Sequence, residues 1–277
     1  MNYTQILFSN ISEEQSEILV ARLSDIGYDG FEEETDTLKA CIKSESFDEN
    51  LLNLVIDINC IKYTKSIIEE ENWNAKWEAD FEPVIVNNPI SSKPFVYIRA
   101  SFHKPDSSFE YDIEVTPKMS FGTGHHATTY LMVEQMSQLN FKNKTVIDFG
   151  TGTGVLAILA EKMGAQSILA IDCDDWSIEN AKENITVNAC TKINIVKAET
   201  IPLANVVDII LANINLNVIT ANIDAIKAST KVGTIILFSG IMLHNEANIV
   251  NVLQQTKINI KAVYKMGDWL ALLTEVE

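Results

Sequence analysis

The chain has 277 residues, a net charge of −17 and 47% hydrophobic residues, and these values exclude several classes of protein. The length suits about two domains and is sufficient for a sizeable core, while no apolar run approaches the roughly 20 residues of a membrane helix. The first residues lack the basic segment of a secretory signal, and the four cysteines form no C-x-x-C pair. We therefore expect a cytoplasmic protein with reduced thiols, no metal site and no association with membranes.

The negative charge is concentrated near the N-terminus. Residues 1–60 contain thirteen acidic residues against Arg22, Lys39 and Lys43, a net charge of −10. Such an excess argues against direct binding of nucleic acid, whose phosphates require basic surfaces. Two interpretations remain open: the acidic surface only keeps the protein soluble, or it receives a basic partner.

A βαββαβ order is predicted for residues 1–68. A capping box at Ser12–Gln15 opens the first helix, and Gly27 ends it. This order is that of a small α+β domain of the ferredoxin-like type, a fold that many functions share. The expected strands are 3–9, 28–31, 38–42 and 61–67, and the second helix is 47–56.

Residues 69–92 are predicted to connect two domains. Trp73, Trp77 and Phe81 recur every four residues, so one helical face carries all three until Pro83 ends the segment. Aromatic residues at this spacing indicate packing against a neighbouring element. We therefore expect an interdomain helix followed by a Pro- and Asn-rich linker.

A glycine turn follows the first strongly apolar run of the second half. Thr145–Phe149 is a β-branched run that ends at the sequence G-T-G-T-G (150–154), and a helical segment comes next. The following run ends in Asp172, at the tip of the neighbouring strand, where the hydroxyls of a ribose would lie. Val155 stands where a dinucleotide fingerprint requires its third glycine. The spacing therefore predicts a nucleoside ligand, S-adenosylmethionine before NAD.

From residue 145 onward, predicted strands alternate with helical segments. The last two strands are separated only by Gly267–Trp269 and must be antiparallel, whereas helices are expected between the first six. A mostly parallel sheet of seven strands with a terminal hairpin is typical of class I methyltransferases and unlike an NAD domain. Upstream, runs at 95–102 and 109–115 around a turn at 104–108 predict a further β-hairpin. The seven expected strands are 145–149, 167–171, 193–197, 207–212, 234–239, 258–265 and 270–275.

Two further clusters lie where this sheet would open. Asn213 ends the fourth strand, at the topological switch point, although asparagine is also a common turn residue. The second cluster is the glycine loop 120–129, in which Phe121 is placed to cover an apolar part of a ligand. As structure alone, this loop would cap a helix through Thr128 or Thr129.

These motifs together resemble the PrmA family, the bacterial methyltransferases of ribosomal protein L11. The resemblance covers essentially the whole chain. It is carried by F-G-T-G-x-H-x-T-T at 121–129, W-x-x-x-W-x-x-x-F-x-P at 73–83, V-I-D-F-G-x-G-x-G at 146–154 and A-N-I at 212–214. The residues Thr116–Lys118 depart from the Asp-Pro-Gly triplet that often precedes the family's loop.

The resemblance implies S-adenosylmethionine as cofactor and lysine and N-terminal amines of a basic large-subunit ribosomal protein as substrates, with trimethylated products. It implies that Asn213 and Phe121 act at the reacting centre, with Phe121 closing over the methionine portion. The residues it assigns to cofactor binding are Thr129, Gly150, Gly152, Asp172, Asn213 and Phe121.

The sequence therefore predicts an α/β protein: a seven-stranded Rossmann-like class I methyltransferase domain (93–277), a ferredoxin-like substrate-recognition domain (1–68) and a connection (69–92). We expect a monomeric, cytoplasmic protein-lysine N-methyltransferase that does not bind nucleic acid directly. A methyltransferase for another protein or a small-molecule amine is the alternative, because cofactor residues do not contact the acceptor. An NAD-dependent oxidoreductase is a more distant alternative.

Overall fold

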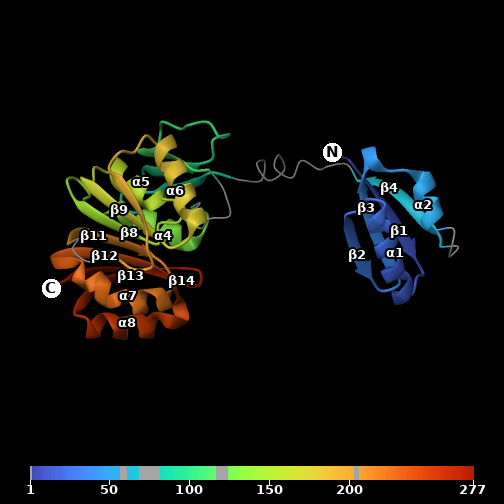
Figure 1. The fold of residues 1–277 in the computed structure, drawn as a ribbon. Helices are drawn as coiled ribbons and strands as arrows, with labels where there is room; N and C mark the ends of the chain where they lie inside the picture. The colour runs from blue at the N-terminus through green and yellow to red at the C-terminus, as the bar shows by residue number, and fades with distance from the viewer. Residues whose placement is uncertain (1, 57–60, 69–81, 117–123, 203–205) are drawn as a thin grey trace. The chain divides into compact units, whose positions relative to one another are not determined.

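The computed structural model describes residues 2–56, 61–68, 82–116, 124–202 and 206–277, and the chain divides into two units, Met1–Ala79 and Asp80–Glu277 (Figure 1). Each unit has a hydrophobic core of its own. None of the helices in the described ranges is both long enough and apolar enough to cross a membrane.

Alternation of apolar and polar residues builds the sheet of the N-terminal unit. Its order is β2-β3-β1-β4, with antiparallel pairing throughout, and β1 and β3 bury every second residue. The predicted capping box is confirmed, because the N–H of Gln15 donates to Ser12 Oγ (3.3 Å) and the N–H of Ser12 to Gln15 Oε1 (2.9 Å). The elements are β1 (Tyr3–Ser9), α1 (Glu13–Asp25), β2 (Gly30–Glu34), β3 (Thr37–Lys43), η1 (Ser44–Ser46), α2 (Glu49–Ile56) and β4 (Tyr63–Ile68). The predicted interdomain helix lies largely outside the described residues.

A three-stranded sheet replaces the hairpin predicted for residues 95–115. β6 (Pro94–Arg99) pairs in parallel with β7 (Tyr111–Glu114), and its antiparallel partner is β5 (Val84–Asn87). The parallel register is stabilised by Arg99, which donates from Nε to Asp112 Oδ1 (2.9 Å) and from Nη1 to Glu114 Oε2 (2.8 Å). The hairpin prediction was wrong because the turn residues at 104–108 lie within a longer crossover connection.

The C-terminal unit is built on a seven-stranded sheet of order β10-β9-β8-β11-β12-β14-β13. The pairs from β10 to β12 are parallel, and β14 is inserted between β12 and β13 with antiparallel pairing to both. The antiparallel terminal pair was predicted correctly. The strands are β8 (Thr145–Phe149), β9 (Ser167–Asp172), β10 (Ile193–Lys197), β11 (Val207–Asn213), β12 (Thr230–Met242), β13 (Ile258–Met266) and β14 (Trp269–Val276).

Helices cover both faces of this sheet, because its strands are apolar on both sides (Figure 1). The helices α4 (Ala127–Met136), α5 (Val155–Lys162) and α6 (Asp175–Val187) lie on one face. On the other face lie α7 (Leu216–Ala228) and α8 (Glu246–Gln255), which is preceded by η2 (Leu243–Asn245). The helix expected between β10 and β11 is not found in the described residues of that connection, which is too short to hold one of ordinary length.

Candidate functional site

Three parallel strands end side by side at one edge of the large sheet. β8 lies between β9 and β11, so the chain turns away in opposite directions on its two sides, which is the arrangement that opens a crevice. Gly150, Asp172 and Asn213 stand at the three strand ends. The structure thus brings together residues that are up to 63 positions apart in the sequence.

The glycine turn after β8 depends on the absence of side chains. Gly150 has φ +78°, and a Cβ there would collide with Cγ2 of Ile214. Gly154, at φ +81°, is the N-cap of α5, and a Cβ there would lie 3.3 Å from Cβ of Ala181 on α6. Both glycines therefore meet a conformational and a packing requirement, and the turn brings bare backbone to the crevice.

The carboxylate of Asp172 is held by backbone groups. The N–H of Gly152 donates to its Oδ2 (2.8 Å), and the N–H of Asp174 donates to its Oδ1 (3.1 Å). These two bonds fix the orientation of the carboxylate at the crevice, where it retains capacity to accept further hydrogen bonds.

A second carboxylate, Asp148, lies beneath the glycine turn and is fully buried. The hydroxyl of Thr151 donates to its Oδ2 (2.6 Å), while Oδ1 is buried without a hydrogen bond of ordinary geometry among the described residues. Burial raises the pKa of Asp148 to about 7, and the bond from Thr151 only partly opposes this. Asp148 therefore stabilises the turn and does not reach the crevice.

Among the described residues, the side-chain amide of Asn213 has a hydrogen-bond partner for its nitrogen but none for its oxygen. Its Nδ2 donates to Oγ1 of Thr129 (3.3 Å), a fully buried residue of α4. Its Oδ1 is buried and has no hydrogen-bond partner among the described residues. An unpaired buried acceptor carries a free-energy cost, so this atom is a site where a ligand donor would be stabilising.

His126 caps α4, whereas Thr128 or Thr129 was predicted to do so. The N–H of Thr128 donates to Nδ1 of His126 (3.3 Å), and both threonines lie buried within the first helical turn. The prediction was wrong because histidine is not among the residues usually preferred as N-caps. The His126 ring also meets the Trp269 ring edge-on, with centroids 4.7 Å apart.

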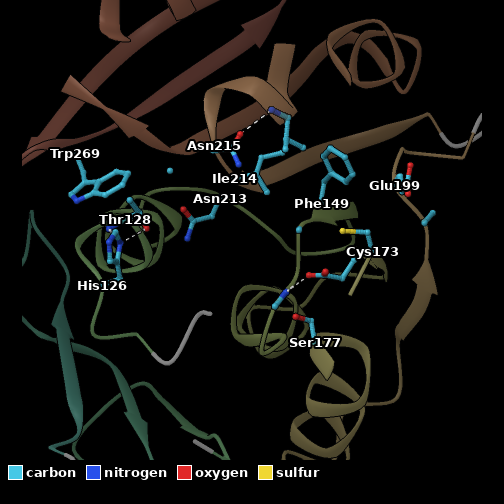
Figure 2. A pocket seen from close by; sticks show the side chains of 16 residues that line it. His126, Thr128, Phe149, Cys173, Ser177, Glu199, Asn213, Ile214, Asn215 and Trp269 are labelled. Carbon is cyan, nitrogen blue, oxygen red and sulfur yellow. Dashed lines mark hydrogen bonds between the residues drawn. The ribbon is translucent and has the colours of Figure 1, made fainter. Parts of the chain in front are cut away.

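A cavity of about 440 Å³ lies at these strand ends. Figure 2 shows His126, Thr128 and Trp269 at one end and Cys173, Ser177 and Glu199 at the other. Asn213 and Ile214 lie between the two ends (Figure 2). The cavity is lined by His126, Thr128, Phe149, Gly150, Gly152, Asp172, Cys173, Ser177, Ala198, Glu199, Asn213, Ile214, Asn215, Val218, Gly240 and Trp269.

The cavity unites most of the predicted site residues. Gly150, Gly152, Asp172 and Asn213 line it, while Thr129 stands behind Asn213 as a hydrogen-bond partner. Phe121 lies outside the described residues.

Sequence reasoning missed Trp269 and Gly240. Trp269 reaches the cavity because β14 pairs with β12, which sets it opposite Met242. The signal available in the sequence was a tryptophan directly after the turn residues Gly267 and Asp268, but that pattern alone does not reveal which strand edge it joins.

The residues present fit S-adenosylmethionine. Glycines free the backbone at the end of β8, a fixed carboxylate stands at the end of β9, and the cavity has room for a nucleoside with an attached amino acid. A parallel sheet with β14 inserted antiparallel beside β12, and with this site at its switch point, defines a class I S-adenosylmethionine-dependent methyltransferase.

Comparison with known proteins defines the family. The model of the PrmA family, ribosomal protein L11 methyltransferase, matches residues 6–277. A ribosomal protein L11 methyltransferase of Phocaeicola vulgatus is 33% identical over 255 residues, covering 88% of this chain and 89% of the relative. The ribosomal protein L11 methyltransferase of Chlorobaculum tepidum is 34% identical over 287 residues, covering 99% of this chain and 96% of the relative. The chain therefore belongs to the family of ribosomal protein L11 methyltransferases.

A solved structure agrees with this assignment. The crystal structure of the ribosomal protein L11 methylase from Lactobacillus delbrueckii subsp. bulgaricus has a TM-score of 0.63 and 28% identity. The similarity covers 70% of this chain and 98% of that one. The cofactor is S-adenosylmethionine, as the cavity indicates, and the chain is a methyltransferase.

Proposed function

We propose that this methyltransferase modifies ribosomal protein L11, on lysine side chains and on the N-terminal amine, and carries methylation through to the trimethylated state. The names of its relatives supply the substrate. The observation that supports an amine as acceptor is the Oδ1 of Asn213, which is buried beside the cavity and has no hydrogen-bond partner in the part of the chain that the structure describes. An amine offers N–H groups to such an acceptor.

The proposed cofactor-binding roles are supported by the way the described groups are held. Asp172 accepts hydrogen bonds from the ribose hydroxyls, because its carboxylate is already fixed by two backbone N–H groups. Gly150 and Gly152 let the backbone approach the cofactor closely. Thr129 holds the Asn213 amide in place, and the role of closing over the methionine portion is given to Phe121 by the family resemblance alone.

The bound cofactor supplies a methyl group on a sulfonium, which carries its own leaving group, so the protein contributes mainly positioning and electrostatics. An acceptor amine must be neutral to attack, yet a free lysine side chain has a pKa of about 10.4. The rings of His126 and Trp269 meet edge-on at one end of the cavity, where they would desolvate a bound amine. Such desolvation lowers the pKa of an amine. Asn213 Oδ1 then accepts an N–H of the neutral amine and so orients the lone pair of the amine nitrogen.

The N-terminal unit is proposed as the substrate-recognition domain, of the ferredoxin-like type, over residues 1–68, with 69–92 connecting it to the methyltransferase domain at 93–277. Its antiparallel order β2-β3-β1-β4 supports that fold. Glu32, Glu33, Glu34 and Asp36 are exposed on β2 and the turn after it, and they suit a basic ribosomal protein. Electrostatic attraction of this kind mainly raises the rate of encounter.

Replacement of Asn213 tests this assignment. Asn213→Ala removes the acceptor for the amine and should lower kcat more than it raises the Kd for S-adenosylmethionine. Asn213→Asp is the matched variant, because it keeps an oxygen at Oδ1, and it should retain more turnover than alanine does. Single-turnover rates and calorimetric Kd values check both expectations. A single-turnover rate for Asn213→Ala equal to that of the unmutated protein would reduce Asn213 to a turn residue.

A further inference from the structure

Ile214 is enclosed by two glycines that come from different strands. A Cβ on Gly150, after β8, would collide with Cγ2 of Ile214. A Cβ on Gly240, within β12, would lie 2.5 Å from the carbonyl O, 2.7 Å from C and 2.9 Å from N of the same residue. One glycine therefore leaves room for the side chain of Ile214, and the other leaves room for its backbone.

The backbone of Ile214 is tied to the strand that contains Gly240. The N–H of Ile214 donates to the carbonyl of Ser239 (3.2 Å), and Asn213 stands in register with Ser239. Gly240 has φ +81° and lies where the pairing of β12 with β14 shifts register, a local irregularity of the kind that re-aims neighbouring groups near active sites. The path of the chain just after Asn213 is thus determined by what stands at position 240.

We infer that Gly240 and Gly150 are positioning residues for Asn213. By leaving room for Ile214 they fix the peptide that follows Asn213, and so they set where its amide faces the cavity. This inference rests on the proposed role of Asn213 in aiming the acceptor amine. Figure 2 shows Asn213 and Ile214 next to each other at the middle of the cavity.

Gly240→Ala is the first test. The added methyl group meets the backbone of Ile214, so kcat on ribosomal protein L11 should fall by about a hundredfold, as for a misplacement of about an ångström. The Kd for S-adenosylmethionine should change by much less. Gly233→Ala is the matched control, because Gly233 has φ +83° and no atom of the described ranges lies within 4 Å of an added Cβ. It carries the same backbone strain and should keep its turnover.

A double-mutant cycle at the other glycine tests the same idea without Gly240. Gly150→Ala meets Cγ2 of Ile214, and Ile214→Leu removes that branch while keeping the volume of the side chain. Adding Ile214→Leu to Gly150→Ala should restore turnover by about tenfold, whereas adding Ile214→Val, which keeps Cγ2, should restore none. If Ile214→Leu and Ile214→Val changed the turnover of Gly150→Ala equally, the inference would be overturned, even if Gly240→Ala failed to fold.

A readout without acceptor separates this inference from the proposed function. In protein labelled with 15N at asparagine, the NMR signals of the Asn213 side chain are identified by their loss in Asn213→Asp. These signals should shift in Gly240→Ala and stay in place in Gly233→Ala. Unchanged signals together with turnover equal to the Gly233→Ala control would overturn the inference. If the unmutated protein fails to methylate ribosomal protein L11, the proposed function falls, and a shift of these signals in Gly240→Ala still supports the positioning of Asn213.

Discussion

At the scale of single residues, the site is built from polar groups whose orientation is set before any ligand arrives. Two backbone N–H groups hold Asp172, and Thr129 holds Asn213. Groups that are already fixed cost less conformational entropy on binding, so their contacts contribute more fully to affinity. Each can therefore be tested by its removal.

Asp172→Ala should weaken S-adenosylmethionine binding by about 1.5 to 3 kcal/mol, the range for lost hydrogen bonds to a charged group, or roughly ten- to a hundredfold in Kd. Part of this loss comes from releasing the N–H of Gly152. Calorimetry measures the change, and Asp224→Ala on the exposed surface of α7 serves as the control. An unaltered Kd in Asp172→Ala would remove the assignment to the ribose.

Asp148 should make stability depend on pH. Its pKa is raised to about 7 in the folded chain against about 3.9 when unfolded, so the folded state binds the proton more tightly. Its contribution to the free energy of unfolding is therefore greatest below about pH 4 and falls as pH rises to about 7, by up to about 1.4 kcal/mol per unit.

Asp148→Asn stays neutral, so its stability relative to the unmutated protein should increase from pH 5 to pH 7. Urea denaturation across that range measures the difference, with exposed Asp224→Asn as control. A difference that stays constant with pH would show that Asp148 does not titrate there.

The residues of the site that lie at strand ends could be predicted from the sequence. Parallel strands bring their carboxyl ends to one edge, so Asp172 and Asn213, each at the end of an apolar run, were placed correctly without a structure. The positions of His126 and Trp269 were not predicted. His126 is an N-cap, a position that histidine rarely occupies, and Trp269 is placed by the long-range pairing of β14 with β12.

At the scale of elements, one face of α6 holds the glycine turn in place. Asn180 and Asn184 lie four residues apart on this helix, and Asn188, its C-cap residue, follows at the same spacing. Asn184 donates to the carbonyl of Thr153 (2.8 Å) and accepts from the N–H of Thr116 (2.8 Å). Asn188 bonds both backbone groups of Glu114, at the end of β7. The three-stranded sheet and the glycine turn are thus connected through α6.

Asn184→Ala should lower the free energy of unfolding by about 2 to 3 kcal/mol, because it removes the hydrogen bonds to the carbonyl of Thr153 and the N–H of Thr116. Asn251→Ala, on the exposed surface of α8, is the control and should stay within about 0.5 kcal/mol. Denaturant unfolding of both variants measures this. Equal stabilities would mean that water replaces the lost bonds.

The elements themselves were predicted to different degrees. The strands from 145 to 276 follow the apolar runs closely, because strands covered by helices on both faces must be apolar throughout. The prediction of a hairpin at 95–115 was wrong because turn residues indicate a change of direction but not which strand the chain pairs with next. The parallel pairing of β6 and β7 depends on Arg99 and its two carboxylates, which only the folded chain brings together.

At the scale of the whole molecule, charge and chemistry lie on different units. Residues 1–60 carry a net charge of −10, whereas the cavity belongs entirely to the unit Asp80–Glu277. A basic substrate would be attracted by the first unit and methylated by the second. Such an attraction is screened by salt.

Capture of ribosomal protein L11 by the full chain should therefore weaken as salt increases, since the Debye length falls from about 10 Å at 0.1 M to about 3 Å at 1 M. A fragment that begins at Asp80 should bind S-adenosylmethionine normally, methylate slowly and show a much smaller salt effect. Initial rates of both proteins at low substrate concentration measure this. Parallel salt slopes for the two would mean that the acidic unit only keeps the protein soluble.

We expect this chain to transfer methyl groups from S-adenosylmethionine to amines of ribosomal protein L11. Intact-mass and peptide mass spectrometry of purified ribosomal protein L11, after incubation with the protein and the cofactor, tests it most directly. We expect additions of up to three methyl groups at lysine and N-terminal amines, dependent on the cofactor and strongly reduced with Asn213→Ala. If ribosomal protein L11 stays unmodified while the enzyme binds the cofactor by calorimetry, the proposed function is wrong.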